Sequence, residues 1–145
     1  MPHIITVNTP GRALVDITTR IKSLLSASAV TDGVAHLFVQ HTSASLVIQE
    51  NADPDVLSDL IAYFDRLAPE DGPYQHSAEG PDDMPAHIKS ALTSTTLTIP
   101  FSDRRFLLGT WQGVYLFEHR RTAHQRRIAV SFIGEAYFEN QPLGL

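Results

Sequence analysis

Hydrophobic and polar residues alternate over several short segments of the chain, which is the pattern of strands that bury one face. Segments 4–9 and 13–17 alternate in this way on either side of Pro10-Gly11, and this arrangement predicts a hairpin. β-branched and apolar residues predict further strands at 34–41, 45–49, 95–101, 106–110, 114–119 and 127–134.

Three other segments have the apolar spacing of amphipathic helices. The first is predicted to begin at Thr18 or Thr19 and to end near residue 28. The second begins at Asp53-Pro54, an N-cap residue followed by proline at the first helical position. The third, at 85–92, follows a polar loop rich in proline. Strands at both ends with helices between them predict an α+β fold with a mostly antiparallel sheet.

The composition sets limits on the class of protein. A chain of 145 residues with 43% hydrophobic residues suits one domain over 1–145. No apolar run is long enough to span a membrane, and no secretory signal is evident at the N-terminus. Cysteine is absent, which excludes disulfides, thiolate zinc sites and cysteine nucleophiles, and this fits a cytoplasmic location.

The net charge of −5 argues against nucleic acid or an anionic membrane as a partner. Ten of the sixteen acidic residues lie between Glu50 and Asp83, whereas six of the nine arginines lie between Arg104 and Arg127. This segregation fits two solvated surfaces of opposite sign. It equally fits an arginine-lined pocket for a phosphorylated small molecule.

Three of the seven histidines are candidate metal ligands. His41 lies at a strand end, His76 in the proline-rich loop and His87 in the first turn of the third helix. Taken singly, each fits an ordinary structural histidine, but three imidazoles from three elements suit a metal with one open position. The other four are interpreted as structural or solvated: His3, His36, His119 and His124.

Glu118 shares a strand face with Val114 and Leu116. Burial there would raise the pKa of its carboxyl unless a cation or metal offsets the desolvation. It is therefore a candidate general acid/base or metal ligand, the alternative being a strand-end glutamate that turns to solvent beside Arg120.

The turn 109–113 links two apolar strands and has glycine at both ends. Trp111 and Gln112 inside it could receive a planar heterocycle by stacking and hydrogen bonding, although structural punctuation is the default interpretation. Asn51, Asp53 and Asp55 could ligate a hard cation, but Asp53 serves equally well as a helix cap. Nucleophile-elbow, phosphate-loop and dinucleotide-binding motifs are absent.

Several motifs follow one another in order along the chain. They are His41-Thr42-Ser43-Ala44-Ser45, Glu50-Asn51-Ala52-Asp53-Pro54, Tyr74-Gln75-His76, Asp82-Asp83-Met84-Pro85-Ala86-His87-Ile88-Lys89, and Leu108-Gly109-Thr110-Trp111-Gln112-Gly113 with Glu118. This ordered set resembles the YjbQ family, whose members are often labelled secondary thiamine-phosphate synthase enzymes, and the match covers nearly the whole chain between about residues 17 and 135.

The resemblance implies a β-sandwich-like sheet with inserted helices, assembled as a homotrimer with pockets near subunit boundaries. It implies a divalent metal, expected to be zinc, on His41, His76 and His87, with magnesium an alternative for a pyrophosphate substrate. It assigns one pocket to the remaining motif residues: Glu118 and Gln112 as catalytic groups, and Trp111, Thr110, Asn51 and Asp53 as substrate-binding groups. Arg127, from the arginine-rich segment, is a further candidate substrate-binding group.

The implied reaction is a thiamine-phosphate synthase transfer, in which hydroxymethylpyrimidine pyrophosphate loses pyrophosphate as a thiazole phosphate nitrogen attacks its methylene carbon. Three histidines are nevertheless more typical of zinc than of the magnesium that usually holds pyrophosphate. The alternatives are a non-catalytic, metal-dependent binder of an anionic metabolite and a metal-dependent phosphohydrolase. The chain also carries Arg104-Arg105-Phe106 where the family commonly has Gly-Arg-Leu, which implies a different turn there.

Overall fold

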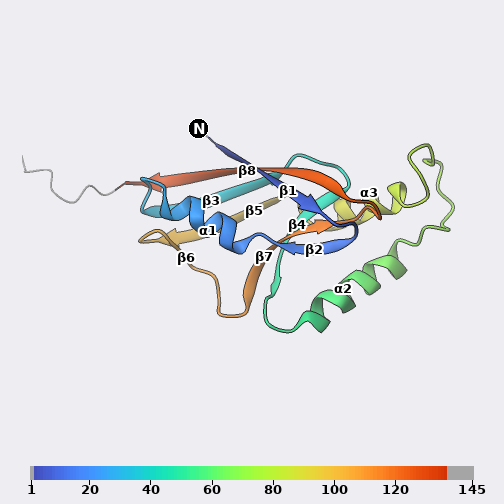
Figure 1. Cartoon of the computed structure of the whole chain (residues 1–145), viewed down its shortest axis with the longest axis horizontal. Helices are drawn as coiled ribbons and strands as arrows, with labels where there is room; N and C mark the ends of the chain where they lie inside the picture. Colours follow the sequence, from blue (N-terminus) through green and yellow to red (C-terminus); the bar gives the residue numbers. More distant parts are fainter. Residues whose placement is uncertain (1, 137–145) are drawn as a thin grey trace, which may run out of the picture.

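The computed structural model describes residues 2–136 and confirms an α+β fold with antiparallel strand pairing (Figure 1). No helix within this range is long and apolar enough to cross a membrane. The elements in chain order are β1 (His3–Thr9), β2 (Ala13–Asp16), α1 (Thr18–Ser26), β3 (Asp32–Val39), β4 (Ala44–Glu50), α2 (Pro54–Leu67), α3 (Asp83–Leu92), β5 (Thr96–Ser102), β6 (Arg105–Phe106), β7 (Gln112–Glu118) and β8 (His124–Glu135).

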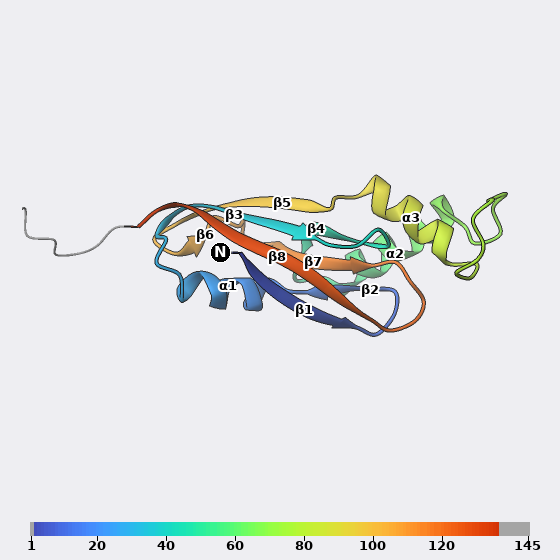
Figure 2. The ribbon, with the colours of Figure 1, turned by 90° about the horizontal axis from the view of Figure 1, so that it is seen from above.

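The strands form two sheets that face each other across the core (Figures 1 and 2). One sheet has the order β1-β8-β3-β5-β6 and the other the order β2-β7-β4. Alternate residues of β1, β3, β5 and β8 are buried, as the period of two along a strand requires. This is the sandwich-like arrangement that the resemblance to the YjbQ family implied.

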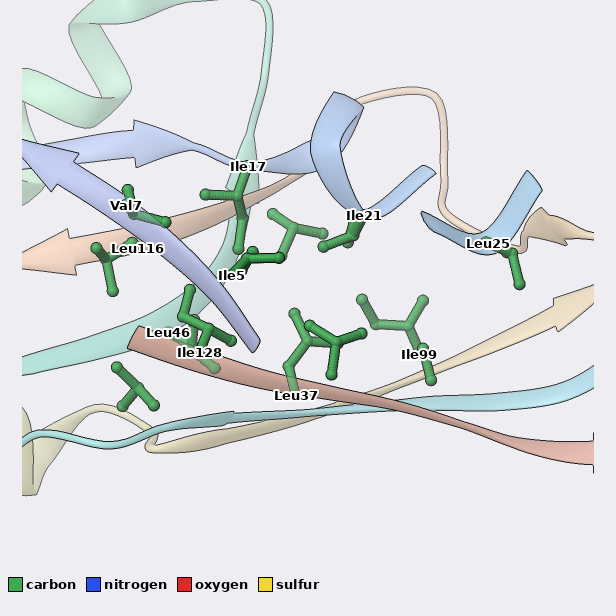
Figure 3. Close-up of a cluster of buried hydrophobic side chains, with 14 of the residues drawn as sticks. Ile5, Val7, Ile17, Ile21, Leu25, Leu37, Leu46, Ile99, Leu116 and Ile128 are labelled. Carbon is green, nitrogen blue, oxygen red and sulfur yellow. The ribbon is translucent and has the colours of Figure 1, made fainter. Parts of the chain in front are cut away.

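The core is filled from both sheets and from α1. Ile128 and Leu37 come from the larger sheet, Leu116 and Leu46 from the smaller one, and Ile21 from α1 (Figure 3). β7 is buried on both faces, because Phe117 points away from this core and packs edge-on against Phe64 of α2. The position of Glu118 follows from this alternation: it lies on the inner face, between the two sheets.

The predicted hairpin of segments 4–9 and 13–17 is wrong. β1 pairs with β8 and β2 pairs with β7, so the two segments belong to different sheets. The reason is the corner at Pro10-Gly11. Gly11 has φ +124°, and a Cβ there would lie 2.3 Å from the Arg121 carbonyl oxygen. The chain therefore turns out of one sheet and into the other rather than folding back on itself.

The strand predicted at 106–110 is also shorter than expected, since only Arg105–Phe106 pairs with β5. Leu107 is largely exposed, so the apolar run here does not mark a buried strand. Asp53 and the proline after it do begin α2, and the Asp53 carboxylate accepts a hydrogen bond from the Asp55 N–H. α1 ends at Ser26 and its N-cap is Ile17, and α3 begins at Asp83, two residues before the predicted start.

Candidate metal centre

Two of the three candidate histidines converge on one carboxylate. Asp83 opens α3 and His87 follows four residues later, so both side chains lie on the same face of the helix. Asp83 Oδ2 lies 2.6 Å from Nε2 of His76, which arrives from the preceding loop, and 3.2 Å from Nε2 of His87. The three ligand atoms all lie within 4.8 Å of one another. Two imidazoles and a carboxylate at this spacing can hold one divalent metal ion.

Hydrogen bonding fixes the tautomer of His87. Its Nδ1 lies 3.0 Å from the Thr42 carbonyl oxygen, which can only accept a hydrogen bond. In the neutral ring Nδ1 therefore carries the hydrogen, and Nε2 directs its lone pair toward Asp83. A lone pair and a carboxylate oxygen repel each other unless a proton or a cation lies between them. A hydrogen bond from the second ring nitrogen to a carbonyl, as from His87 Nδ1 to Thr42, is the usual way in which a metal-binding histidine is oriented.

Arg120 holds the other side of the acidic pair. Its Nη1 lies 2.9 Å from Asp83 Oδ1, and its Nε donates to Asp82 Oδ2 at 2.9 Å. Burial acts to raise the pKa of Asp83, but the hydrogen bond from His76 and the charge of Arg120 outweigh it and lower this pKa. Asp83 is therefore ionised at neutral pH, with Oδ1 taken by arginine and Oδ2 turned to the histidines.

His41 lies beside this cluster without joining it. Together with His87 and Thr42 it lines a hollow of about 240 Å³, so the two rings border the same space. Its Nε2 accepts a hydrogen bond from the Arg127 backbone N–H at 2.8 Å, and its Nδ1 lies 3.4 Å from Arg126 Nη1. Burial, and then the charge of Arg126, lower the pKa of His41. The ring is thus kept neutral, but both nitrogen atoms face N–H donors instead of Asp83.

Glu118 is fully buried in an ion pair with Arg126. Its Oε1 accepts hydrogen bonds from Arg126 Nε and from the Thr9 hydroxyl, both at 2.7 Å, and its Oε2 accepts from Arg126 Nη2. Burial raises the pKa of Glu118, but the hydrogen bonds from Arg126 and Thr9 lower it by more. A cation therefore offsets the desolvation, and the carboxylate is ionised with both oxygens occupied.

The motif residues around Trp111 form a second cluster. Asn51 Nδ2 donates to the Thr110 carbonyl at 3.0 Å, and Gln112 Oε1 accepts from the Gly109 N–H at 2.7 Å. The Trp111 ring is exposed, and Asp53 caps α2 nearby. These contacts hold the turn in shape and leave the indole free to meet a ligand or another molecule.

The two clusters lie at opposite ends of one strand pair. In the β4–β7 ladder Ala44 faces Glu118, whereas Glu50 faces Gln112. Six residue steps at the rise of a β-strand separate these ends by roughly 20 Å. Within one chain the Trp111 cluster and the histidine cluster therefore do not form the single pocket that the family resemblance implied. Arg127 lies at the histidine end, since its N–H bonds to His41.

Sequence reasoning missed several residues of the site. Asp83 was detectable, because an acid four residues before a histidine in a helix shares its face. Arg126 shares strand parity with Ile128 and Val130 of β8, which indicates burial but not which partner it meets. Phe38 lines a second hollow of about 500 Å³ together with His41 and Thr95. The alternation of apolar and polar residues along its strand did not indicate that this ring borders a hollow.

Comparison with known proteins agrees with this fold. The chain matches the family described as "UPF0047 protein YjbQ-like" over residues 3–135. It is 53% identical to a UPF0047 protein of Synechocystis over 92% of this chain and 91% of the relative. It is 45% identical to the UPF0047 protein YjbQ of Escherichia coli O157:H7 over 79% of this chain and 83% of the relative.

Solved structures give the same assignment. An uncharacterised YjbQ/UPF0047 protein of Clostridium acetobutylicum superposes with a TM-score of 0.84 at 36% identity, covering 90% of this chain and 99% of its own. A hypothetical protein of Aeropyrum pernix superposes with a TM-score of 0.85 at 26% identity, covering 93% and 99%. The family match, the sequence identity and the superposition all extend over most of the chain, and the chain belongs to the YjbQ (UPF0047) family.

Proposed function

We propose that this chain is a metal-dependent enzyme that acts on a phosphorylated small molecule, with a thiamine-phosphate synthase-like transfer as its reaction. The observation that carries the proposal is the approach of two imidazole Nε2 atoms to Oδ2 of the buried Asp83. A metal held there would supply positive charge to a departing pyrophosphate. A carboxylate among the donors suits a metal that also binds phosphate oxygens better than three histidines would.

The surface beside the cluster supports an aromatic, phosphorylated substrate. Two adjoining hollows of about 240 and 500 Å³ share His41, Thr42 and Thr95. Phe38 offers an exposed aromatic ring on the second hollow, on which a planar heterocycle can stack. The Arg127 guanidinium forms no ion pair among residues 2–136, and its charge lowers the pKa of His41 less than the charge of Arg126 does. It can therefore bind phosphate oxygens, as the sequence suggested.

The transfer needs little acid–base chemistry from the protein. The thiazole nitrogen forms a bond to the pyrimidine methylene carbon, and the bond from that carbon to the pyrophosphate oxygen breaks, with the electron pair leaving on pyrophosphate. Arg127 would bind the phosphate and Phe38 would orient the ring, so that the reacting atoms meet. Glu118, in its pair with Arg126, would keep the His41 end of the site in place.

Release of pyrophosphate from the two precursors tests this proposal. We expect wild type with a divalent metal to release pyrophosphate only when both precursors are present. We expect the rate of pyrophosphate release by His87→Ala to be at least 100-fold lower than that of wild type. His36→Ala is the matched control, because His36 contacts Thr98 and lies on another strand face. Equal rates in wild type and His87→Ala would contradict the proposal. Release without the thiazole phosphate would identify a phosphohydrolase instead, and binding without turnover a metabolite binder.

We also propose that the enzyme is a homotrimer in which the Trp111 turn of one copy approaches the histidine cluster of another. The roughly 20 Å between the two clusters within one chain leaves a shared pocket possible only between copies. α2 supports such an assembly, because none of its residues is fully buried and Tyr63 and Leu67 are exposed on it.

Light scattering after gel filtration tests the assembly. A mass three times the 16.0 kDa of the chain is expected, and Tyr63→Lys is expected to lower it. Arg20→Lys, on α1, is the control that keeps a cationic side chain on a different face. A monomeric wild type at micromolar concentration would contradict the homotrimer and leave the metal site untouched.

A further inference from the structure

Some lysines and arginines of the chain form ion pairs with carboxylates and others do not. Of the eleven lysines and arginines, five form ion pairs with carboxylates in the described part of the chain: Arg12, Lys89, Arg120, Arg121 and Arg126. Lys22, Arg104 and Arg105 form none there, although the chain carries a net charge of −5. Six cations therefore lack a carboxylate partner in the described part of this acidic protein, and Lys22, Arg104 and Arg105 are three of them.

These three side chains lie around one hollow. It has a volume of about 330 Å³ and is lined by Lys22 and Ser26 of α1 and by Arg104, Arg105 and Phe106 of the β5–β6 hairpin. Figures 1 and 2 both show α1 beside β6, at the end of the molecule opposite α3. The hollow is thus distinct from the histidine cluster, and its size is within the range of small-molecule pockets.

The hairpin holds Arg104 in an unfavourable backbone conformation. Ser102 pairs with Arg105, and the two residues between them have φ +52° at Asp103 and φ +54° at Arg104. Such a turn favours glycine or asparagine, because a larger side chain at positive φ is strained. Strain of this kind gathers at functional sites. In this turn, Arg104 occupies a position whose backbone conformation favours glycine, so the arginine is not explained by folding alone.

Nearby carboxylates do not neutralise the hollow. The Asp32 carboxylate accepts hydrogen bonds from the Ser102 hydroxyl at 2.6 Å and the Asp103 N–H at 3.2 Å, so it stabilises the turn. Neither Asp32 nor Asp103 lies within ion-pair distance of Arg104 or Arg105 in the described chain. Two guanidinium groups and one ammonium are left to attract a multivalent anion.

We propose that this hollow is a second binding site, for an organic phosphate. Guanidinium groups bind phosphate oxygens through paired, charge-assisted hydrogen bonds, and Lys22 adds a third positive charge. Phe106 is half-buried against Phe101 and offers an apolar surface beside the charges. A ligand with a phosphate group and an apolar or aromatic body matches these features. The site is independent of the proposed metal-dependent reaction.

Calorimetric titration with inorganic phosphate, inorganic pyrophosphate and phenyl phosphate, in EDTA, tests this site without the metal. We expect Arg104→Gly and Arg105→Gln each to raise the Kd for pyrophosphate about tenfold, the size of one lost charge-assisted contact. Arg104→Gly should not lower the Tm, since glycine relieves the positive φ, so a loss of binding is not a loss of folding. Phenyl phosphate should bind more tightly than inorganic phosphate.

Two variants make the outcome decisive. Arg66→Gln removes the same charge from α2, where Arg66 lies over the Tyr63 ring, and should leave the Kd within twofold of wild type. His87→Ala disrupts the histidine cluster and should bind pyrophosphate in EDTA as wild type does. Wild-type affinity in both Arg104→Gly and Arg105→Gln, or an equal loss in Arg66→Gln, would overturn the proposal. Loss of binding in His87→Ala would assign the phosphate to the metal site instead.

Discussion

The carboxylates of Glu118 and Asp83 each pair with an arginine, but they differ in how many of their oxygens the protein occupies. Glu118 lies between the sheets, and both of its oxygens accept hydrogen bonds from Arg126, while the Thr9 hydroxyl and the Arg120 backbone N–H each donate one more. Asp83 lies at the start of α3 and gives one oxygen to Arg120, while the other faces two histidine nitrogens whose rings reach solvent. The first carboxylate is saturated by protein donors, whereas the second has room for a ligand.

This difference separates a structural ion pair from a reactive site. In the sequence, an acid on an apolar strand is a candidate catalytic residue. A buried carboxylate, however, stays ionised only if a cation offsets its desolvation, and that cation then occupies its oxygens. A buried acid with one oxygen directed at two partly exposed imidazole nitrogens can still coordinate a metal ion through that oxygen. Whether a carboxylate can bind a metal depends on how many lone pairs of its oxygens are not taken by donors of the protein. That number depends on partners that are distant in sequence.

The largest expected effect is on the buried pair. Arg126→Leu leaves the Glu118 carboxylate buried without its cation, so the free energy of unfolding should fall by about 3–5 kcal/mol. Urea denaturation followed by circular dichroism measures this. Arg127→Leu is the matched control: its side chain is exposed, and the change should stay within about 0.5 kcal/mol. Similar losses in the two variants would mean that Glu118 does not depend on Arg126.

At the other carboxylate we expect a loss of metal binding rather than of stability. Asp83→Asn keeps the shape of the side chain and removes the charge, so zinc affinity should fall about 100-fold, or about 2.7 kcal/mol. Competition with a chromophoric chelator measures the affinity. Asp82→Asn is the neighbouring control, because Asp82 binds Arg120 and not the histidines. Unchanged affinity in Asp83→Asn would remove this carboxylate from the site.

A smaller effect concerns pH and a third group near the interior. Burial, and then the charge of Lys89, lower the pKa of His119 to about 3, and its Nε2 lies 2.8 Å from the Ser45 hydroxyl. Protonation therefore favours the unfolded chain, where the pKa is the ordinary 6.5. This contribution is complete above pH 6.5 and is lost as the pH falls toward 3.

The expected loss is about 2 kcal/mol at pH 5, at 1.4 kcal/mol for each pH unit below 6.5. Urea denaturation at pH 7, 6 and 5 measures it, with His119→Gln as the variant whose slope should flatten. His36→Gln, on a more exposed ring, should retain the wild-type slope. An equal slope in wild type and His119→Gln would show that this histidine titrates normally in the folded state.

The smallest effect is expected at the exposed turn. Trp111→Ala should change the free energy of unfolding by less than about 0.5 kcal/mol, because the indole is 63% exposed. Metal affinity should stay unchanged in a single chain, since the cluster lies at the other strand end. If the subunits share a pocket, the variant should instead raise the KM for the pyrimidine substrate. A large loss of stability would mean that the ring packs within its own chain.

Local patterns predicted much of this molecule. Strand alternation placed Glu118 on an inner face, and Asp53-Pro54 marked the start of α2, because both depend on neighbours along the chain. The pairing of β1 with β8, and of Glu118 with Arg126, joins distant segments and left no local signal. The same holds for His41, whose ring nitrogens are engaged by residues 126 and 127 of β8.

A zinc-soaked crystal with an anomalous difference map tests the central claim most directly. The account predicts one peak at about 2.0–2.2 Å from Nε2 of His76, Nε2 of His87 and Oδ2 of Asp83, with Oδ1 of Asp83 still on Arg120. A reoriented His41 ring within the same distance would add the third predicted histidine. An empty cluster at saturating zinc, or a peak elsewhere in its place, would contradict the account.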